Sequence, residues 1–167
     1  VNSYNLLERF SNSKKREGWL MGKYKSLSFI FAVLCFLLPV PLYCQWLETT
    51  IPVGDNPFDL VYNSLNNKVY CANAFGNTVT VIDGATDSVI TTVPVGNMPD
   101  ALVYNSLNNK VYCANGGSLP DLDTTVAVIN GATDSVIITI PVGYYPRSLV
   151  YNSSNNEVYC ANAGELP

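Results

Sequence analysis

The sequence predicts an all-β protein made of four-stranded antiparallel β-propeller blades, and three observations support this. The stretch LVYNSLNNKVYCAN occurs at Leu60–Asn73 and again at Leu102–Asn115, and a near copy fills Leu149–Asn162. Glycines that mark the repeat, at positions 54, 96 and 143, are 42 and 47 residues apart. Each repeat also holds four short runs rich in Val, Ile, Thr and Tyr. A four-stranded unit of about 40–45 residues is typical of a propeller blade.

The four predicted strands, named a to d in chain order, are bounded by turn residues. Asn66 and Asn67 separate strands a and b, Asp83-Gly84 begins the turn between c and d, and Pro57 precedes strand a. These residue types favour turns or strand starts. In the first repeat the expected strands are Phe58–Asn63, Lys68–Asn73, Thr78–Asp83 and Ser88–Val93.

Composition limits the classes of function. The 167 residues are 48% hydrophobic and 13% charged, which suits one modest folded domain rather than a disordered chain. After residue 44 there are eleven acidic side chains against three basic ones. Such a body repels nucleic acid. The chain has no histidine, the commonest general base and metal ligand. We therefore assign no catalytic residue, cofactor or metal ligand.

Residues 21–44 are predicted to be a secretory signal peptide. Met21 is followed by Lys23 and Lys25 and then by a twelve-residue apolar run, Phe29–Val40, which ends at a proline. The run is short for a membrane span, which needs about 20 residues. We expect cleavage after Cys44 and a secreted chain without a membrane span. An uncleaved signal anchor and a lipid-anchored Cys44 are the alternatives.

Residues 1–20 fit no export pattern, so we interpret them as an upstream extension from a mis-called start and leave them out of the fold. The blades are expected within residues 45–167.

The VYCAN of strand b, followed by TVTVIDGATDSVITTVPVG, resembles the YVTN-type β-propeller repeat, with Cys-Ala in place of Val-Thr. The resemblance runs from about Thr50 to Asn162, and both motifs recur in register. It implies a propeller of the seven-bladed, WD40-like type. Members of this family are commonly exported or on the cell surface of bacteria and archaea, and most have no assigned chemistry.

The predicted strands make an incomplete ring of about two and a half blades. Leu47–Val53 matches strand d alone, two full blades follow, and Leu149–Asn162 supplies only strands a and b, which gives eleven strands. A closed ring needs about four to eight blades. We interpret the chain as the N-terminal fragment of a longer propeller. The alternative is a short protein that closes its ring by cyclic self-assembly.

Three cysteines, Cys71, Cys113 and Cys160, occupy the same position in successive strands b. Disulfide formation requires Cα atoms within about 7 Å, whereas packed sheets are about 10 Å apart. No histidine or CxxC motif accompanies them as in a metal site. We expect buried, apolar cysteines.

The candidate binding surface lies on one face of the blades. Because strands in a meander alternate in direction, the d–a and b–c loops emerge together, and these loops differ between repeats whereas the a–b and c–d turns are nearly constant. Loops on a rigid scaffold often bind ligands, although turns without packing constraints also drift. The candidate residues are Phe58, Asp59, Phe75, Met98, Asp100, Asp121, Asp123, Tyr144, Tyr145 and Arg147.

Two groups within this set have specific interpretations. Asp121 and Asp123 form a D-x-D pair of the kind used in calcium sites, although a solvated acidic loop is the simpler explanation. Tyr144 and Tyr145 are expected as an exposed aromatic pair that grips a sugar ring or a partner chain. The alternative for the tyrosines is packing against the next blade.

The expected function is an exported, non-enzymatic module that binds a protein or carbohydrate partner or serves as surface structure. The alternative is a propeller enzyme of the metal-dependent hydrolase type. Its site would use Asp59, Asp100 and Arg147, one from each blade, and would be completed by blades absent from this chain. Propellers host both classes, so the fold does not decide between them.

Overall fold

The computed structural model describes residues 6–11, 46–118 and 123–164, and every regular element in these ranges is a strand. No described helix is long and apolar enough to span a bilayer. The strands are β1 (Leu6–Ser11), β2 (Trp46–Pro52), β3 (Pro57–Asn63), β4 (Lys68–Asn73), β5 (Thr78–Asp83), β6 (Ser88–Pro94), β7 (Pro99–Asn105), β8 (Lys110–Asn115), β9 (Thr125–Asn130), β10 (Ser135–Pro141), β11 (Pro146–Asn152) and β12 (Glu157–Asn162).

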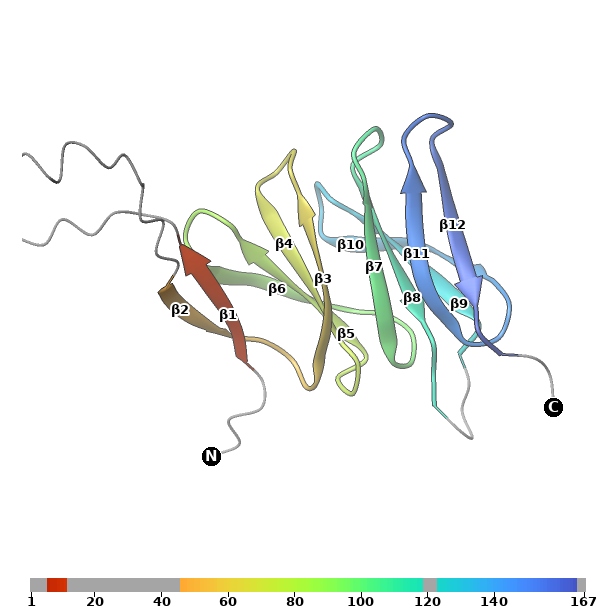
Figure 1. Ribbon diagram of the computed structural model, residues 1–167, viewed down its shortest axis with the longest axis horizontal. Coiled ribbons are helices and arrows are strands. Elements are labelled where there is room, and N and C mark those ends of the chain that lie inside the picture. The colour runs from red at the N-terminus through yellow and green to blue at the C-terminus, as the bar shows by residue number, and fades with distance from the viewer. Residues whose placement is uncertain (1–5, 12–45, 119–122, 165–167) are drawn as a thin grey trace, which may run out of the picture. The chain divides into compact units, whose positions relative to one another are not determined.

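The described strands form two complete four-stranded sheets and two two-stranded sheets (Figure 1). β3 to β6 pair in chain order as one antiparallel sheet, the first blade, and β7 to β10 form the second blade. β11 and β12 form a half-blade. These elements lie within one of the two compact units into which the chain divides, residues 1–8 with 49–167. The predicted fold class, all-β with two and a half four-stranded units, is confirmed.

The N-terminal part of the described chain differs from the sequence prediction. β1 lies in the stretch that the sequence patterns leave out of the fold, and it pairs with β2 in a two-stranded sheet. β2 corresponds to the lone strand d. A strand d without a neighbour would expose its backbone N–H and C=O groups, and pairing satisfies some of them.

Left-handed asparagine and aspartate residues close the constant turns. Asn67 ends the turn between β3 and β4 with φ 51°, as the tolerance of asparagine for this region predicts. Between β5 and β6 the left-handed residue is Asp87, with φ 56°, and not Gly84. Gly84 is needed for a different reason, because a Cβ there would lie 2.8 Å from the backbone oxygen of Asn67.

The hydrophobic core lies between the first and second blades. Tyr70, Val79 and Val81 of the first blade are fully buried against residues of the second blade such as Val111 and Ile129. Burying side chains of this size stabilises the fold by about 1.5–3 kcal/mol each. The apolar character of both sheet faces follows from this stacking, because a blade between two neighbours is covered on both sides.

Polar bonds also connect the first and second blades. The Asn63 side-chain amide donates to Asn109 Oδ1 at 2.8 Å, and the Asn66 side chain donates to the Gly131 carbonyl at 2.5 Å. The equivalent of the Asn63–Asn109 bond recurs one blade further on, where the Asn105 amide donates to Asn156 Oδ1 at 2.9 Å. The repetition explains why the a–b turns are nearly constant: their asparagines carry blade-to-blade contacts.

A β-bulge lies at the start of strand a in each repeat, that is, at the start of β3, β7 and β11. Pro57 pairs with Asn73 and Asp59 pairs with Ala72, so Phe58 is the extra residue. The register shifts in the same way in β7 and β11, which makes Asp100 and Arg147 the corresponding bulge residues. β3 begins at Pro57, one residue earlier than the predicted start at Phe58. Bulges re-aim the side chain they carry.

Candidate functional site

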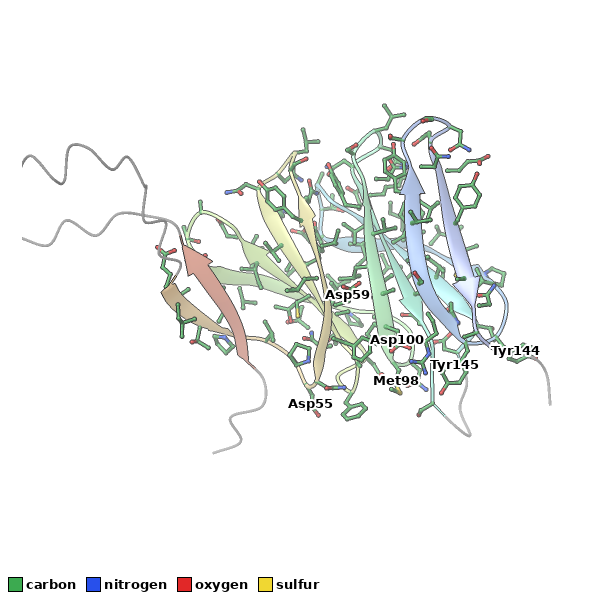
Figure 2. All side chains as sticks on the ribbon, in the orientation of Figure 1. Asp55, Asp59, Met98, Asp100, Tyr144 and Tyr145 are labelled. Carbon is green, nitrogen blue, oxygen red and sulfur yellow. The ribbon has the colours of Figure 1, made fainter. Side chains whose placement is uncertain are left out.

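The d–a and b–c loops lie at one end of the blades, as predicted. Each b–c loop bonds to the d–a loop before it: the Ala74 amide donates to the Asn56 carbonyl at 2.8 Å, and the Gly116 amide donates to the Met98 carbonyl at 2.9 Å. Figure 2 shows labelled residues of the d–a loops at this same end. We call the surface formed by residues 54–58, 74–77, 96–100, 116–118, 123–124 and 143–147 the loop face.

One residue in each d–a loop has a left-handed backbone. Asn56, Met98 and Tyr145 have φ values of 54°, 47° and 57°. Asparagine adopts this conformation readily, whereas methionine and tyrosine rarely do, and such strain often marks a functional position. The same backbone thus presents a different side chain from each repeat. Sequence reasoning selected Met98 and Tyr145 for their variability but missed their strained backbone.

The three bulge residues are equivalent in position and different in chemistry. Phe58 is 58% exposed, whereas Asp100 is buried with 6% exposed. Arg147 lies between two groups of the loop face, with its Nε 3.6 Å from Asp100 Oδ2 and its guanidinium 4.7 Å from the centre of the Tyr145 ring. Burial raises the pKa of the Asp100 carboxyl, and the nearby Arg147 cation partly opposes this rise.

Asp59 and Asp100 occupy different positions within their blades. Its Oδ2 accepts the Leu102 amide of the second blade at 2.6 Å, and its Oδ1 accepts the Leu60 amide at 2.8 Å. The equivalent residue in β7 is Ala101, one residue past the bulge. Asp59 therefore connects two blades, and Figure 2 shows it further from the loop end than Asp100. Among the described residues no three His, Cys, Asp or Glu side chains gather as a metal site would require.

The Asp123 carboxylate has several donors around it. Its Oδ2 accepts the Asn97 amide at 2.7 Å, and its Oδ1 accepts the Thr124 amide and the Thr125 hydroxyl at 2.7 and 2.6 Å. The Asn97 bond holds the inserted b–c loop against the d–a loop that precedes the same blade, and the two threonine bonds fix the end of the b–c loop itself. Asp121, its partner in the D-x-D pair, lies outside the described residues.

The most exposed apolar side chains of the loop face come from the first blade. Phe75 of the b–c loop is 64% exposed, and Phe58 at the start of β3 is 58% exposed. Tyr144 and Tyr145 are half-buried rather than exposed as expected. The reason is local packing: a Cβ at Gly164 would lie 3.2 Å from the Cβ atoms of both tyrosines, so the chain there approaches them closely, and Arg147 stacks on Tyr145.

The cysteines do not contribute to the loop face. Cys71 and Cys113 are free and fully buried, as predicted. Cys160 is free and partly exposed, so the predicted burial is wrong for this residue, which lies on a strand that pairs with β11 alone among the described strands. Burial, with the Asp59 charge as a smaller cause, raises the pKa of the Cys71 thiol to about 11. Burial raises the pKa of Cys113 as well. Thiols of this kind are inert at neutral pH.

Comparison with solved structures identifies the fold. Hydrazine synthase from Kuenenia stuttgartiensis aligns with a TM-score of 0.60 and 22% identity over 70% of this chain and 32% of that one. A mitotic checkpoint complex structure aligns with a TM-score of 0.61 and 17% identity, over 70% and 35%. Both neighbours have β-propeller-like folds. The chain has the β-propeller fold.

A third structure, a functionally unknown protein from Desulfotomaculum acetoxidans, aligns with a TM-score of 0.58 and 13% identity over 70% of this chain and 38% of that one. The chain spans about a third of the length of these structures. No protein-family model matches the sequence, and no curated protein does. The propeller fold positions the loop face, and the chemistry of that face must be argued from its own residues.

Proposed function

We propose that this chain is an exported, non-enzymatic β-propeller module of the YVTN repeat type that binds a polypeptide partner through its loop face. One observation carries the proposal: Phe58 and Phe75 are 58% and 64% exposed on the face where otherwise near-identical repeats differ. Aromatic side chains are enriched at the centres of protein interfaces.

The chemistry of these side chains favours a polypeptide over a carbohydrate. The exposed rings are phenylalanines, which offer no hydrogen-bonding group for sugar hydroxyls, and the tyrosines nearby are half-buried. Met98 adds a flexible thioether, which adapts to apolar partner side chains. We therefore expect a partner segment that presents apolar side chains. Binding to glycans instead would contradict this part of the proposal.

The non-enzymatic part is supported by how the carboxylates are used. The oxygens of Asp59 and Asp123 accept backbone amides, and Asp100 faces Arg147. A metal-dependent hydrolase would need carboxylates that converge on an ion. The purified chain is expected to hold no divalent metal by elemental analysis. Stoichiometric metal that is lost in an Asp59→Asn variant would support the enzyme instead.

Export is tested with a reporter. Residues 21–44 fused ahead of a phosphatase that is active only outside the cytoplasm should give activity. Replacing Leu37 and Leu38 in the apolar run with aspartate should abolish that activity. Equal activity from both fusions would contradict export.

The binding proposal is tested with selected peptides. Peptides from a random display library are selected on the full chain, and their Kd is compared between two double variants. Phe58→Ser with Phe75→Ser removes the exposed rings of the loop face. Leu65→Ser with Leu107→Ser is the matched control, because these side chains are 67% and 71% exposed on the a–b turns.

The loop-face variant should weaken binding at least about tenfold, since truncating a central aromatic anchor typically costs 2 kcal/mol or more. The control variant should bind like the parent chain. Peptides that lose affinity only with the control variant would place binding on the a–b turns and overturn the proposal.

A further inference from the structure

One carboxylate of the second blade is held by two side chains of the first. Asp134 is the left-handed residue of the c–d turn between β9 and β10, with φ 53°, and its amide donates to the Asn130 carbonyl at 2.8 Å. Its Oδ2 lies 2.6 Å from Lys68 Nζ, and its Oδ1 accepts the Tyr70 hydroxyl at 2.8 Å. Both oxygens are therefore bound from β4, and the carboxyl carbon between them is fixed with them.

The Lys68 amine is positioned by the same turn. Its Nζ also lies 3.4 Å from the Gly131 carbonyl oxygen, so the amine has two acceptors in the second blade. The side chains of Lys68 and Asp134 are largely buried, and Tyr70 is fully buried. The amine is thus kept within hydrogen-bond distance of a carboxyl group in a site that excludes most water. Reacting groups held in this way are in position for a bond to form between them.

We propose that Lys68 and Asp134 form an intramolecular isopeptide bond, an amide between the lysine amine and the aspartate carboxyl group, which joins the first and second blades covalently. The freshly folded chain holds the ion pair, and the amide forms slowly from it. The proposal does not depend on the loop face or its function. Its residues lie on β4 and in the β9–β10 turn, so only the two complete blades are involved.

The reaction releases one water molecule and needs no oxidant. A proton moves from Nζ to Oδ2 along their hydrogen bond, which gives a neutral amine beside a carboxylic acid. The Nζ lone pair then attacks Cγ, and the Tyr70 hydroxyl stabilises the negative charge that develops on Oδ1. A second Nζ proton passes to Oδ2, which leaves as water while the Oδ1 carbonyl re-forms. One ammonium group and one carboxylate thus give one amide and one water.

Tyr70 has the properties of an oxyanion donor. Burial, with the hydrogen bond to Asp134 as a smaller cause, raises the pKa of the Tyr70 hydroxyl above its ordinary value of 10.0. The hydroxyl therefore stays protonated at neutral pH and can donate to Oδ1 at every stage of the reaction. A donor that is in place before the charge develops needs no reorganisation when it does.

Proximity favours an amide that would not form between free molecules in water. Well-oriented intramolecular groups react as if they were present at about 10⁵–10⁸ M. The resulting bond would also restrict the unfolded chain, as a disulfide does, because it joins residues 66 positions apart. The cysteines of the described chain are all free, so no disulfide within the described residues provides this restraint.

The test follows the mass of the 167-residue chain after it is refolded from urea and kept at neutral pH for several days. We expect a species lighter by the mass of one water molecule to accumulate. A sample of the same age in urea should keep its full mass, because Lys68 and Asp134 meet only when the blades pack.

Digestion with trypsin identifies where the water was lost. The proposed bond gives a branched peptide in which Lys68 is joined to Asp134 and resists cleavage. Succinimide formation at Asp83-Gly84 also releases water, but it leaves unbranched peptides and a cleavable Lys68.

Matched variants test the roles of the residues. Lys68→Arg keeps a cation beside Asp134 but removes the amine nucleophile, so this chain should fold and keep its full mass. Lys110→Arg is the control at the equivalent position of β8 and should lose water at the parent rate. Tyr70→Phe keeps both reacting groups and should slow the reaction about a hundredfold, the typical effect of removing one oxyanion donor.

The proposal is overturned by the absence of any branched peptide in the folded parent chain, or by equal water loss in the parent and Lys68→Arg. A branched peptide that forms as fast in Tyr70→Phe as in the parent would overturn the role assigned to Tyr70. Near-UV circular dichroism of each variant establishes that it is folded, so a missing bond is not mistaken for an unfolded chain.

Discussion

Lys68 Nζ and Asp134 Oδ2 lie 2.6 Å apart across the boundary between the first and second blades. Both side chains are largely buried, with 16% and 11% exposed, and Asp134 also accepts the Tyr70 hydroxyl. The Asp134 carboxylate thus binds two side chains of the first blade, one of them 66 positions earlier in the sequence. The first prediction concerns this contact.

Lys68→Met should lower the free energy of unfolding by about 1–3 kcal/mol, because it leaves a partly buried carboxylate without its cation. Urea denaturation of the full chain measures the change. Lys110→Met is the matched control at the equivalent position of β8 and should change stability by less than about 0.5 kcal/mol. Equal losses in the two variants would show that the Asp134 contact is not the cause.

Calcium should not stabilise the inserted loop of the second blade. Both oxygens of Asp123 accept hydrogen bonds from Asn97, Thr124 and Thr125, so an ion would have to displace these donors. The melting temperature should be the same in millimolar calcium and in chelator. A rise in Tm with calcium that is lost in an Asp123→Asn variant would restore the D-x-D calcium interpretation.

Asp100 should make the chain less stable as pH rises. Burial raises its pKa above the ordinary value of 3.8, so the native chain binds this proton more tightly than the unfolded chain. The resulting stability is fully present below pH 3.8 and is lost as pH rises through the folded pKa.

An Asp100→Asn variant cannot ionise, so its stability should fall less over this pH range than that of the parent chain. Arg147→Gln removes the cation that opposes the rise in pKa, so the fall should extend to higher pH. Chemical denaturation at a series of pH values measures both curves. Parallel curves for the parent chain and Asp100→Asn would contradict the assignment.

Thiol reactivity should separate the three cysteines of the blades. Cys71 and Cys113 are fully buried, and the pKa of Cys71 is about 11, so neither forms thiolate at neutral pH. Cys160 is partly exposed. Alkylation of the native chain, followed by peptide mapping, should modify Cys160 much faster than the other two, whereas all three should react equally in denaturant. Fast modification of Cys71 in the native chain would show that the first blade opens readily.

The repeat period made the strands predictable. The four strands predicted in the first repeat agree with β3 to β6 to within one residue, because the turn residues recur in register and each recurrence reinforces the others. The shared position of the d–a and b–c loops followed from strand alternation alone. Burial of Cys71 and Cys113 was predicted correctly, since the faces of an apolar blade pack against neighbouring elements, whereas the same prediction was wrong for the partly exposed Cys160.

The backbone of the loop face was not predicted. Met98 and Tyr145 have left-handed backbones, although neither residue type favours this conformation. The signal was available in the first repeat, where Asn56 occupies the equivalent position and asparagine tolerates a positive φ. Aligning the three d–a loops on Asn56 would have identified both residues.

The roles of the charged residues depended on contacts that spacing does not reveal. Phe58, Asp100 and Arg147 each follow the proline that begins the strand, so the aligned repeats already show that Asp59 and Asp100 are not equivalent. The repeats do not show that these three positions are bulged. A bulge adds one residue to one strand of a hydrogen-bonded pair. Because every repeat contains this bulge, no difference between the repeats reveals it. The Asp100–Arg147 ion pair could not be found from the sequence either, because its two residues belong to different blades.

The decisive measurement for the binding surface is hydrogen–deuterium exchange of the full chain, alone and saturated with the tightest selected peptide. The loop-face account predicts slower exchange in residues 54–58, 74–77 and 96–100, with no change in the a–b turns at residues 64–67 and 106–109. Protection confined to those turns, with unchanged exchange around Phe58 and Phe75, would contradict it.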